Sequence, residues 1–228
     1  MVMEFFKGGA DKPLEEIESL IIQMLHDDRH TFDLAINALV GGTDAKAVGK
    51  EVRKSDKRVN RAEREVRRRL LVHAAIQGER VDLTRVLIAM SVIKDAERVG
   101  DHAKNIWDLA RAGIDFSSAD DAKWLRGLRD QTSRFIAECS RIYQERDAAA
   151  AHELIPVMDA AQDEFDECIE KQLASEDAAR EAVPRALLCR YLKRITGHLM
   201  NVITSLVMPL ERLDYYDEDK ADRGPVTE

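Results

Sequence analysis

Apolar residues recur every three to four positions along most of the chain, a pattern typical of amphipathic helices. No proline falls between residues 14 and 155, so long helices are possible there. Glycines near residues 41, 78 and 113 end successive segments of the pattern. We therefore predict helices at Leu14–Val40, Asp44–Gln77, Val81–Arg111, Ala119–Glu145, Ala148–Ala174 and Pro184–Leu213.

Local signals refine these helices. Pro13 lies in the first turn of the first helix, and Ser118 followed by Asp121 resembles a capping box for the fourth. Pro156 predicts a kink in the fifth helix. Segments much longer than the usual helix of about 11 residues favour an elongated all-α bundle.

The helices also repeat along the chain. A shift of 103 residues places Asp56 on Asp159 and Glu63 on Asp166. A shift of 96 residues aligns Arg98 with Arg194, Val99 with Ile195, His102 with His198, Asn105 with Asn201 and Ile106 with Val202. Chance matching of amphipathic helices is the alternative, but polar residues at equal spacing favour duplication.

The repeat predicts the organisation of the chain. We expect two tandem three-helix bundles that share an elongated core, as a six-helix array. The expected parts are an N-terminal extension over 1–14, a first repeat over 15–113, a diverged second repeat over 118–213 and an acidic tail over 214–228.

Composition narrows the class of protein. Charged residues make up 34% of the chain, the formal net charge is −8, and aromatic residues contribute only 5%. The acidic balance argues against a nucleic-acid binder, and no apolar stretch is long enough to span a membrane. Because no secretion signal is present, Cys139, Cys168 and Cys189 are interpreted as free thiols in a reducing cytoplasm.

The third helix carries carboxylates on an apolar face. Val86, Met90 and Ile93 mark that face, and the next positions along it are Glu97 and Asp101. A carboxylate at a core position is costly unless a bound cation or a basic partner compensates its charge. This pair is therefore the leading candidate for a binding site.

The second helix offers a matching set of oxygen donors. Asp56, Asn60 and Glu63 lie on one face, and packed against the third helix they would complete an all-oxygen cage. Such cages suit Mg²⁺, Mn²⁺, Ca²⁺ or iron rather than zinc. Asp163 and Glu167 show the same spacing, so solvated surface carboxylates are the alternative interpretation.

The sequence gives little support for a histidine metal site, for a nucleotide-binding site or for catalysis. His26 and His30 are spaced for metal binding, but an exposed or interfacial place on the first helix is the simpler interpretation. No phosphate-binding loop, dinucleotide fingerprint or catalytic set occurs, so we predict no enzyme. The basic second helix is interpreted as a solvated face with i, i+4 ion pairs, and a docking surface for an acidic partner is the alternative.

The segment from Asp82 to Ile106 reads DLTRVLIAMSVIKDAERVGDHAKNI. It resembles the signature helix of the PhoU family, in which an Asp-Leu-Arg start precedes an apolar helix, Glu-Arg-Ile-Gly-Asp and Lys-Asn-Ile. The spacing from Asp82 to Asp101 matches without a gap, and a weaker resemblance extends over about residues 15–213.

This resemblance implies a cytoplasmic, all-helical, homodimeric regulator without direct membrane insertion or nucleic-acid binding. Such proteins restrain phosphate uptake and phosphate-starvation signalling by contacting the phosphate transporter's ATPase subunit and a sensor histidine kinase. Several bind metal clusters through Glu/Asp-x-x-x-Asp motifs. Here the motif maps to Glu97 and Asp101, with Asp56, Asn60 and Glu63 as further ligands of divalent or ferric ions; iron, manganese, magnesium and zinc are not distinguished.

Two departures from the family pattern carry predictions. Thr84 stands where the family has arginine, and Arg85 lies on a different face. In the second repeat, Lys193 and Gly197 replace the two carboxylates, so the second metal site should be weak or absent. Lys193 would instead form a fixed ion pair with the fifth helix, or lie on the surface.

Two rivals to this function remain open. One is an accessory protein of another transporter, such as an ion-coupled phosphate permease, which would share the fold and the metal site. The other is a metal-binding helical protein with no signalling role.

Overall fold

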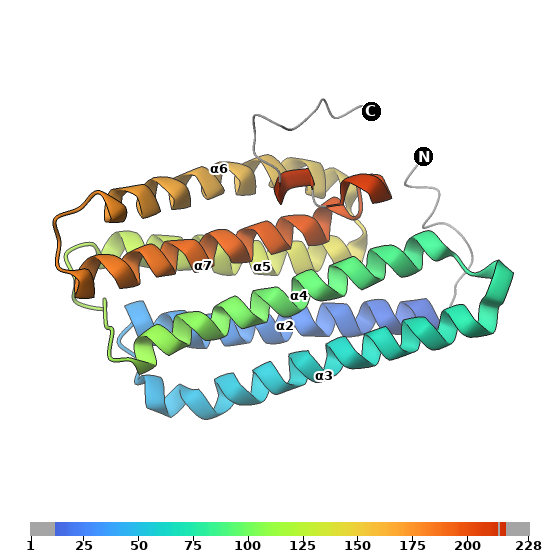
Figure 1. The fold of residues 1–228 in the computed structure, drawn as a ribbon, viewed down its shortest axis with the longest axis horizontal. Helices are drawn as coiled ribbons and strands as arrows, with labels where there is room; N and C mark the ends of the chain where they lie inside the picture. The colour runs from blue at the N-terminus through green and yellow to red at the C-terminus, as the bar shows by residue number, and fades with distance from the viewer. Residues whose placement is uncertain (1–11, 214, 218–228) are drawn as a thin grey trace.

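The computed structural model describes residues 12–213 and 215–217. The described residues form an all-α structure without strands, as predicted (Figure 1). Its long helices are α2 (Lys12–Val40), α3 (Ala45–Gln77), α4 (Leu83–Arg111), α5 (Ala122–Glu145), α6 (Ala148–Leu173) and α7 (Ala179–Thr204). Short 3₁₀ turns follow α3 and α7, at Gly78–Arg80, Leu210–Arg212 and Tyr215–Asp217. Most of the acidic tail and most of the predicted N-terminal extension fall outside the described residues.

The helices form one elongated array. Helix α2 packs against α3, α4 and α5, while α7 packs against α4, α5 and α6. Helices α3 and α6 therefore lie at opposite edges, as Figure 1 shows. A single apolar core runs through both sets of three helices, from Leu14 to Leu213. Val202, Ile203 and Leu206 are buried in it.

Side-chain caps set the start of three helices. The carboxylates of Asp44, Asp82 and Asp147 accept hydrogen bonds from backbone N–H groups in the first turns of α3, α4 and α6. Each cap satisfies a donor that a helix start leaves without a partner. Helix α6 continues through Pro156.

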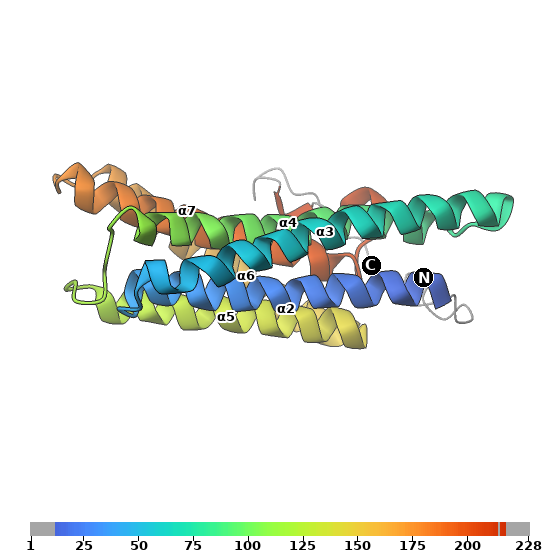
Figure 2. The ribbon, with the colours of Figure 1, turned by 90° about the horizontal axis from the view of Figure 1, so that it is seen from below.

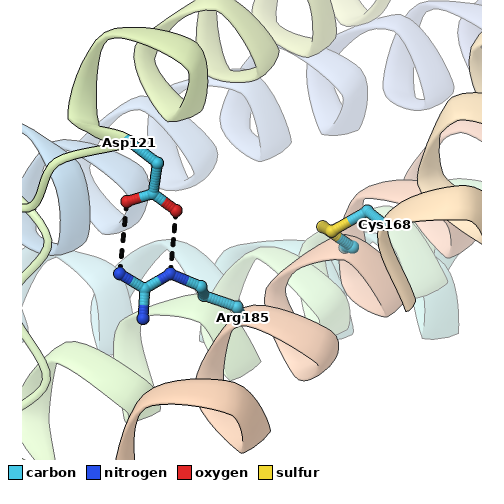
Figure 3. The surroundings of a disulfide bond; sticks show 4 residues. Asp121, Cys168 and Arg185 are labelled. Atoms are coloured by element: carbon cyan, nitrogen blue, oxygen red, sulfur yellow. Dashed lines mark hydrogen bonds and ion pairs between the residues drawn. A yellow bond between two sulfur atoms is a disulfide. The ribbon is translucent and has the colours of Figure 1, made fainter. Parts of the chain in front are cut away.

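The prediction of a capping box before the fourth helix was wrong. Helix α5 begins at Ala122, and the Asp121 side chain does not cap it. That carboxylate instead accepts two hydrogen bonds from Arg185, at 2.8 and 3.2 Å (Figure 3). Arg185 also lies 4.5 Å from the centre of the Phe116 ring, so the start of α5 is fixed by tertiary contacts with α7.

The last helix was also placed incorrectly. It begins at Ala179 rather than Pro184, and it ends at Thr204 rather than Leu213. Pro184 lies inside the helix, five residues after Ala179, so it does not mark the first helical residue. After Thr204 the chain turns before Pro209, and the Thr204 hydroxyl donates to the carbonyl oxygen of Leu213.

The prediction that all three cysteines are free thiols was wrong for two of them. Cys168 and Cys189 form a disulfide, and only Cys139 is a free, buried thiol among the described residues. The two bonded residues are 21 positions apart, but α6 packs against α7 and brings their Cα atoms to 6.4 Å (Figure 3). Spacing along the sequence gave no sign of this pairing.

Two histidines that the sequence repeat aligns meet in space. His102 of α4 and His198 of α7 stack with ring centres 5.6 Å apart and ring planes 15° apart. If two related halves packed about a local two-fold axis, equivalent residues such as these histidines would meet in this way. Within the described residues, no helix combines the length and the apolar character needed to cross a bilayer.

Candidate metal and partner site

The predicted carboxylates gather where α2, α3 and α4 pack together. A narrow cavity between these helices, with no room for a water molecule as the side chains lie, is lined by Asp28, Thr31, Asp56, Val59, Asn60, Glu97, Gly100 and Asp101. Four of the five predicted site residues are among them. We call Asp28, Asp56, Glu97 and Asp101 the carboxylate cluster.

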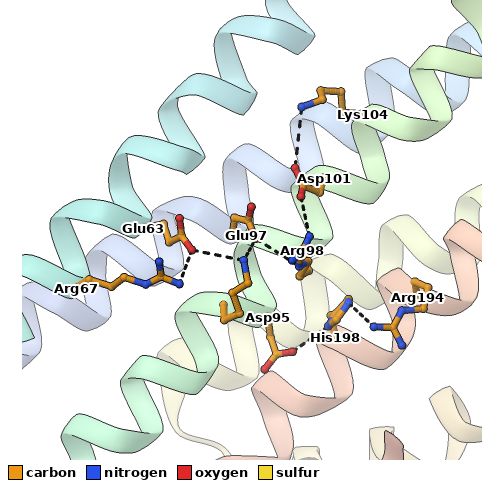
Figure 4. Close-up of polar contacts among 10 residues, drawn as sticks. Glu63, Arg67, Asp95, Glu97, Arg98, Asp101, Lys104, Arg194 and His198 are labelled. Atoms are coloured by element: carbon orange, nitrogen blue, oxygen red, sulfur yellow. Dashed lines mark hydrogen bonds and ion pairs between the residues drawn. The ribbon is translucent and has the colours of Figure 1, made fainter.

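The two carboxylates of α4 are held by cations of the same helix. Glu97 is buried, and its carboxylate accepts from Lys94 at 2.7 Å (Figure 4). Asp101 is partly exposed and accepts from Arg98 at 3.2 Å. Of the apolar face that located them, Val86 and Ile93 are buried, but Met90 is 38% exposed.

Of the three predicted site residues on α3, two line the cavity and one does not. Asp56 accepts from Lys104 of α4 at 2.7 Å, and Asn60 lines the cavity beside it. Glu63, the fifth predicted site residue, does not line the cavity. It lies one turn away and pairs with Arg67 at 2.8 Å and Lys94 at 3.7 Å (Figure 4).

Asp28 of α2 is the residue that sequence reasoning missed. Its side chain is fully buried, and neither carboxylate oxygen has a hydrogen-bond partner among the described residues. The apolar stripe of α2 runs through Ile21, Leu25 and Phe32, and Asp28 occupies a core position on it. The rule that identified Glu97, a carboxylate where a core residue is expected, would also have found Asp28.

Gly100 makes room for this carboxylate. A Cβ atom on Gly100 would lie 2.4 Å from Oδ1 of Asp28, closer than real Cβ contacts come. The glycine therefore lets α4 approach α2 with Asp28 pointing at the α4 backbone between Glu97 and Asp101.

Burial and like charges raise the pKa values of two carboxylates, Asp28 and Asp101. The pKa of Asp28 is raised well above its usual value, first by burial and then by Asp27, Glu97 and Asp101. The pKa of Asp101 is raised by burial and Glu97, against the opposing effect of Lys104 and Arg98. Although burial disfavours its charge, the hydrogen bond with Asp56 and the nearby Asp101 raise the pKa of Lys104.

The donor chemistry fits a hard cation. The cavity offers carboxylate and amide oxygens, and the unpartnered oxygens of Asp28 are what such an ion would satisfy. As the side chains lie here, no three His, Cys, Asp or Glu residues of the described chain are placed to hold a metal together. Lys94, Arg98 and Lys104 instead neutralise the other three carboxylates.

The second repeat has an ion pair at the equivalent place. Lys193 of α7 pairs with Asp166 of α6, as the sequence suggested. Their side chains are 24% and 46% exposed, so Lys193 forms the ion pair and also lies partly at the surface. Solvent screening limits such a pair to about 1 kcal/mol or less.

A separate polar network joins the two halves beside the cluster. Asp95 of α4 and Nδ1 of His198 on α7 are 2.9 Å apart, and Asn201 donates to the same carboxylate at 3.3 Å. Nε2 of His198 lies 3.1 Å from Arg194 (Figure 4). Burial, His198 and Arg194 lower the pKa of His102 to about 4, so this ring is neutral at physiological pH.

At the start of α4, Arg85 does not face the cluster. It pairs with Glu18 of α2 at 3.0 Å. The sequence placed Arg85 on a different face of the helix from the family arginine. Its contact with the first helix agrees with that placement.

Comparison with known proteins agrees with this architecture. Residues 21–110, which include most of α2–α4, match the family model of the PhoU domain. The crystal structure of PhoU from Pseudomonas aeruginosa is similar, with a TM-score of 0.74 at 20% sequence identity. The match covers 88% of this chain and 97% of that one, and it shows the shared fold. No curated protein matches the chain.

Proposed function

We propose that this chain, which carries a PhoU domain over residues 21–110, is a regulator of phosphate uptake and phosphate-starvation signalling. The PhoU family is regulatory rather than enzymatic, and the domain and the fold support a role of that kind. The observation that carries the proposal is the carboxylate cluster inside that domain, where an unpartnered Asp28 faces Glu97 and Asp101.

The proposed mechanism is a protein contact that a metal ion assists. Asp28, Asp56, Glu97 and Asp101 would hold a divalent or ferric ion, which supplies positive charge at the cluster. If these carboxylates held an ion, Lys94, Arg98 and Lys104 would lose their present partners. These cations would then be available to acidic groups of a partner, so the metal content of the cluster would set the charge of the α4 surface.

The proposed partners are the ATPase subunit of a phosphate transporter, a sensor histidine kinase, or both. Both act on the cytoplasmic side of a membrane, so we place the regulator in the cytoplasm. We also propose that it is a homodimer. When phosphate is plentiful, the contact would restrain transport and keep starvation signalling off.

An affinity pull-down from phosphate-replete cells tests these partners. Wild-type protein and the Glu97→Ala/Asp101→Ala variant serve as parallel baits, with captured proteins identified by mass spectrometry. We expect wild type to recover the transporter ATPase or the kinase, and the variant to recover at least about tenfold less, because a lost charge-assisted contact costs about 1.5–3 kcal/mol. Recovery of only an unrelated permease would contradict the phosphate-signalling role.

A further inference from the structure

The solvent-exposed face of α3 has an unusual distribution of charge. All of its exposed charged residues are basic, and they are Lys46, Lys50, Arg53, Lys54, Lys57, Arg61, Arg64, Arg67 and Arg68. The acidic residues of α3 are buried or half-buried. We call these cations the basic stripe; it spans about 33 Å at 1.5 Å per residue.

Much of the basic stripe has no counter-charge. Lys46, Lys50, Lys57, Arg61 and Arg64 have no ion-pair partner among the described residues, in a chain whose net charge is −8. The expected face of interleaved i, i+4 pairs is therefore only partly present. Unpaired cations held in line along one helix favour an extended anionic partner.

The stripe leads directly into exposed apolar side chains. From residue 71 onward the exposed positions of α3 are Leu71, Val72, Ala75 and Ile76. Leu71 is 72% exposed, Ile76 is 73% exposed, and Leu83 at the start of α4 is 57% exposed. We call Leu71, Val72, Ile76 and Leu83 the apolar tip. A cluster of large exposed aliphatic side chains marks a contact surface.

The basic stripe and the apolar tip lie along one edge of the molecule. Helix α3 forms the lower edge of the molecule in Figure 1, and the α3–α4 turn projects beyond the other helices in both views (Figures 1 and 2). Two open hollows lie along this edge, one lined by Lys57, Arg61 and Arg64 and the other by Arg68, Val72 and Ile76. No aromatic residue lies on the stripe to stack with nucleic-acid bases. A planar anionic surface can meet the cations and the aliphatic tip together.

We propose that this edge binds the surface of a bilayer that contains anionic lipids. The basic stripe lies against the headgroups, and the apolar tip enters the boundary between headgroups and acyl chains. The contact needs no spanning helix, but the shallow entry of the apolar tip differs from the absence of direct membrane insertion that the family resemblance implies. It would hold the regulator beside membrane-bound partners, but it does not depend on the proposed phosphate role.

Vesicle co-sedimentation of the purified full chain tests the proposal. The probes are vesicles of phosphatidylcholine alone and vesicles with about 30% phosphatidylglycerol, a charge density that attracts polybasic segments. We expect binding only to the anionic vesicles, with loss as NaCl rises from about 0.05 to about 0.5 M. Equal binding to neutral vesicles, or no binding to either, would overturn the proposal.

Two variants with the same change in charge distinguish an effect of the basic stripe on binding from an effect of the net charge of the protein. Lys50→Gln/Lys57→Gln/Arg61→Gln/Arg64→Gln should weaken partitioning at least about 100-fold, since each cation near an anionic membrane contributes roughly fivefold. The control changes exposed cations on α5 and α7, as Lys123→Gln/Arg134→Gln/Arg180→Gln/Arg190→Gln. We expect it to bind like wild type; an equal loss in both variants would overturn the assignment.

The apolar tip has a test of its own. Leu71→Ser/Ile76→Ser should weaken vesicle binding about tenfold or more without changing its salt dependence, because buried apolar area and charge contribute separately. Thermal unfolding of each variant verifies that it is folded. Binding to an acidic protein or to DNA that exceeds binding to anionic vesicles would show that the stripe serves another partner and overturn the membrane assignment.

Discussion

Replacing Asp28 with asparagine is expected to stabilise the metal-free protein at neutral pH. The Asp28 carboxylate is fully buried without a partner, next to Glu97 and Asp101. An uncompensated buried charged group costs about 1–3 kcal/mol or more. The asparagine side chain would keep the shape, remove the charge and offer N–H donors to the neighbouring carboxylates. We expect the free energy of unfolding at pH 7 to rise by about 1–3 kcal/mol.

The same substitution should flatten the pH dependence of stability. Because the folded-state pKa of Asp28 is raised above its unfolded value, the native state binds the proton more tightly. Its contribution to stability is complete below the unfolded pKa and is lost as pH rises through the folded pKa. Metal-free wild type should therefore gain stability as pH falls from 7 toward 4, and Asp28→Asn should gain less.

Chemical denaturation with a chelator present, at a series of pH values, measures both effects. Asp130→Asn on exposed α5 surface is the matched control, and it should change stability by less than about 0.5 kcal/mol. Adding Mn²⁺ should stabilise wild type but not Asp28→Asn. An Asp28→Asn variant that is less stable than wild type at pH 7 without metal would show that Asp28 has a partner.

The second large effect concerns metal content. Glu97→Gln/Asp101→Asn should reduce bound iron or manganese at least about tenfold, because each hard-cation site depends on its charged oxygen ligands. Elemental analysis of purified protein, backed by calorimetric titration with Mn²⁺, gives the measurement. Both substitutions keep the side-chain volume, so the three-helix packing should survive.

A matched carboxylate pair provides the control. Asp163 and Glu167 of α6 have the same i, i+4 spacing, so Asp163→Asn/Glu167→Gln removes two charges from the second repeat. We expect this control to retain its metal, because Lys193 and Gly197 stand where that repeat would need ligands. Equal metal loss in both variants would contradict a single site in the first repeat.

Periodicity predicted the helices better than it predicted their ends. Apolar spacing located all six long helices, since each must bury one face. The start of α5 was missed because Asp121 interacts with Arg185, 64 residues away. The end of α7 was missed because apolar residues continue into the turn after Thr204, where Leu206 is buried without being helical.

Helix spacing also predicted which residues of α3 and α4 lie together, but it did not identify Asp28 of α2. Glu97, Asp101, Asp56 and Asn60 meet because α3 and α4 face each other, which helix spacing implies. Asp28 comes from a third helix, and its role depends on how closely α2 approaches Gly100. The Cys168–Cys189 bond likewise depends on the register between α6 and α7. Contacts between distant elements were the part that a single sequence did not reveal.

We propose that this protein restrains the phosphate-starvation response through its carboxylate cluster. The most direct test is a starvation-response reporter in phosphate-replete host cells that lack the gene, complemented with wild type, Glu97→Ala/Asp101→Ala or Asp163→Asn/Glu167→Gln. We predict that deletion turns the reporter on, and that wild type and the α6 variant turn it off while the α4 variant does not. A reporter that stays off after deletion would contradict the account.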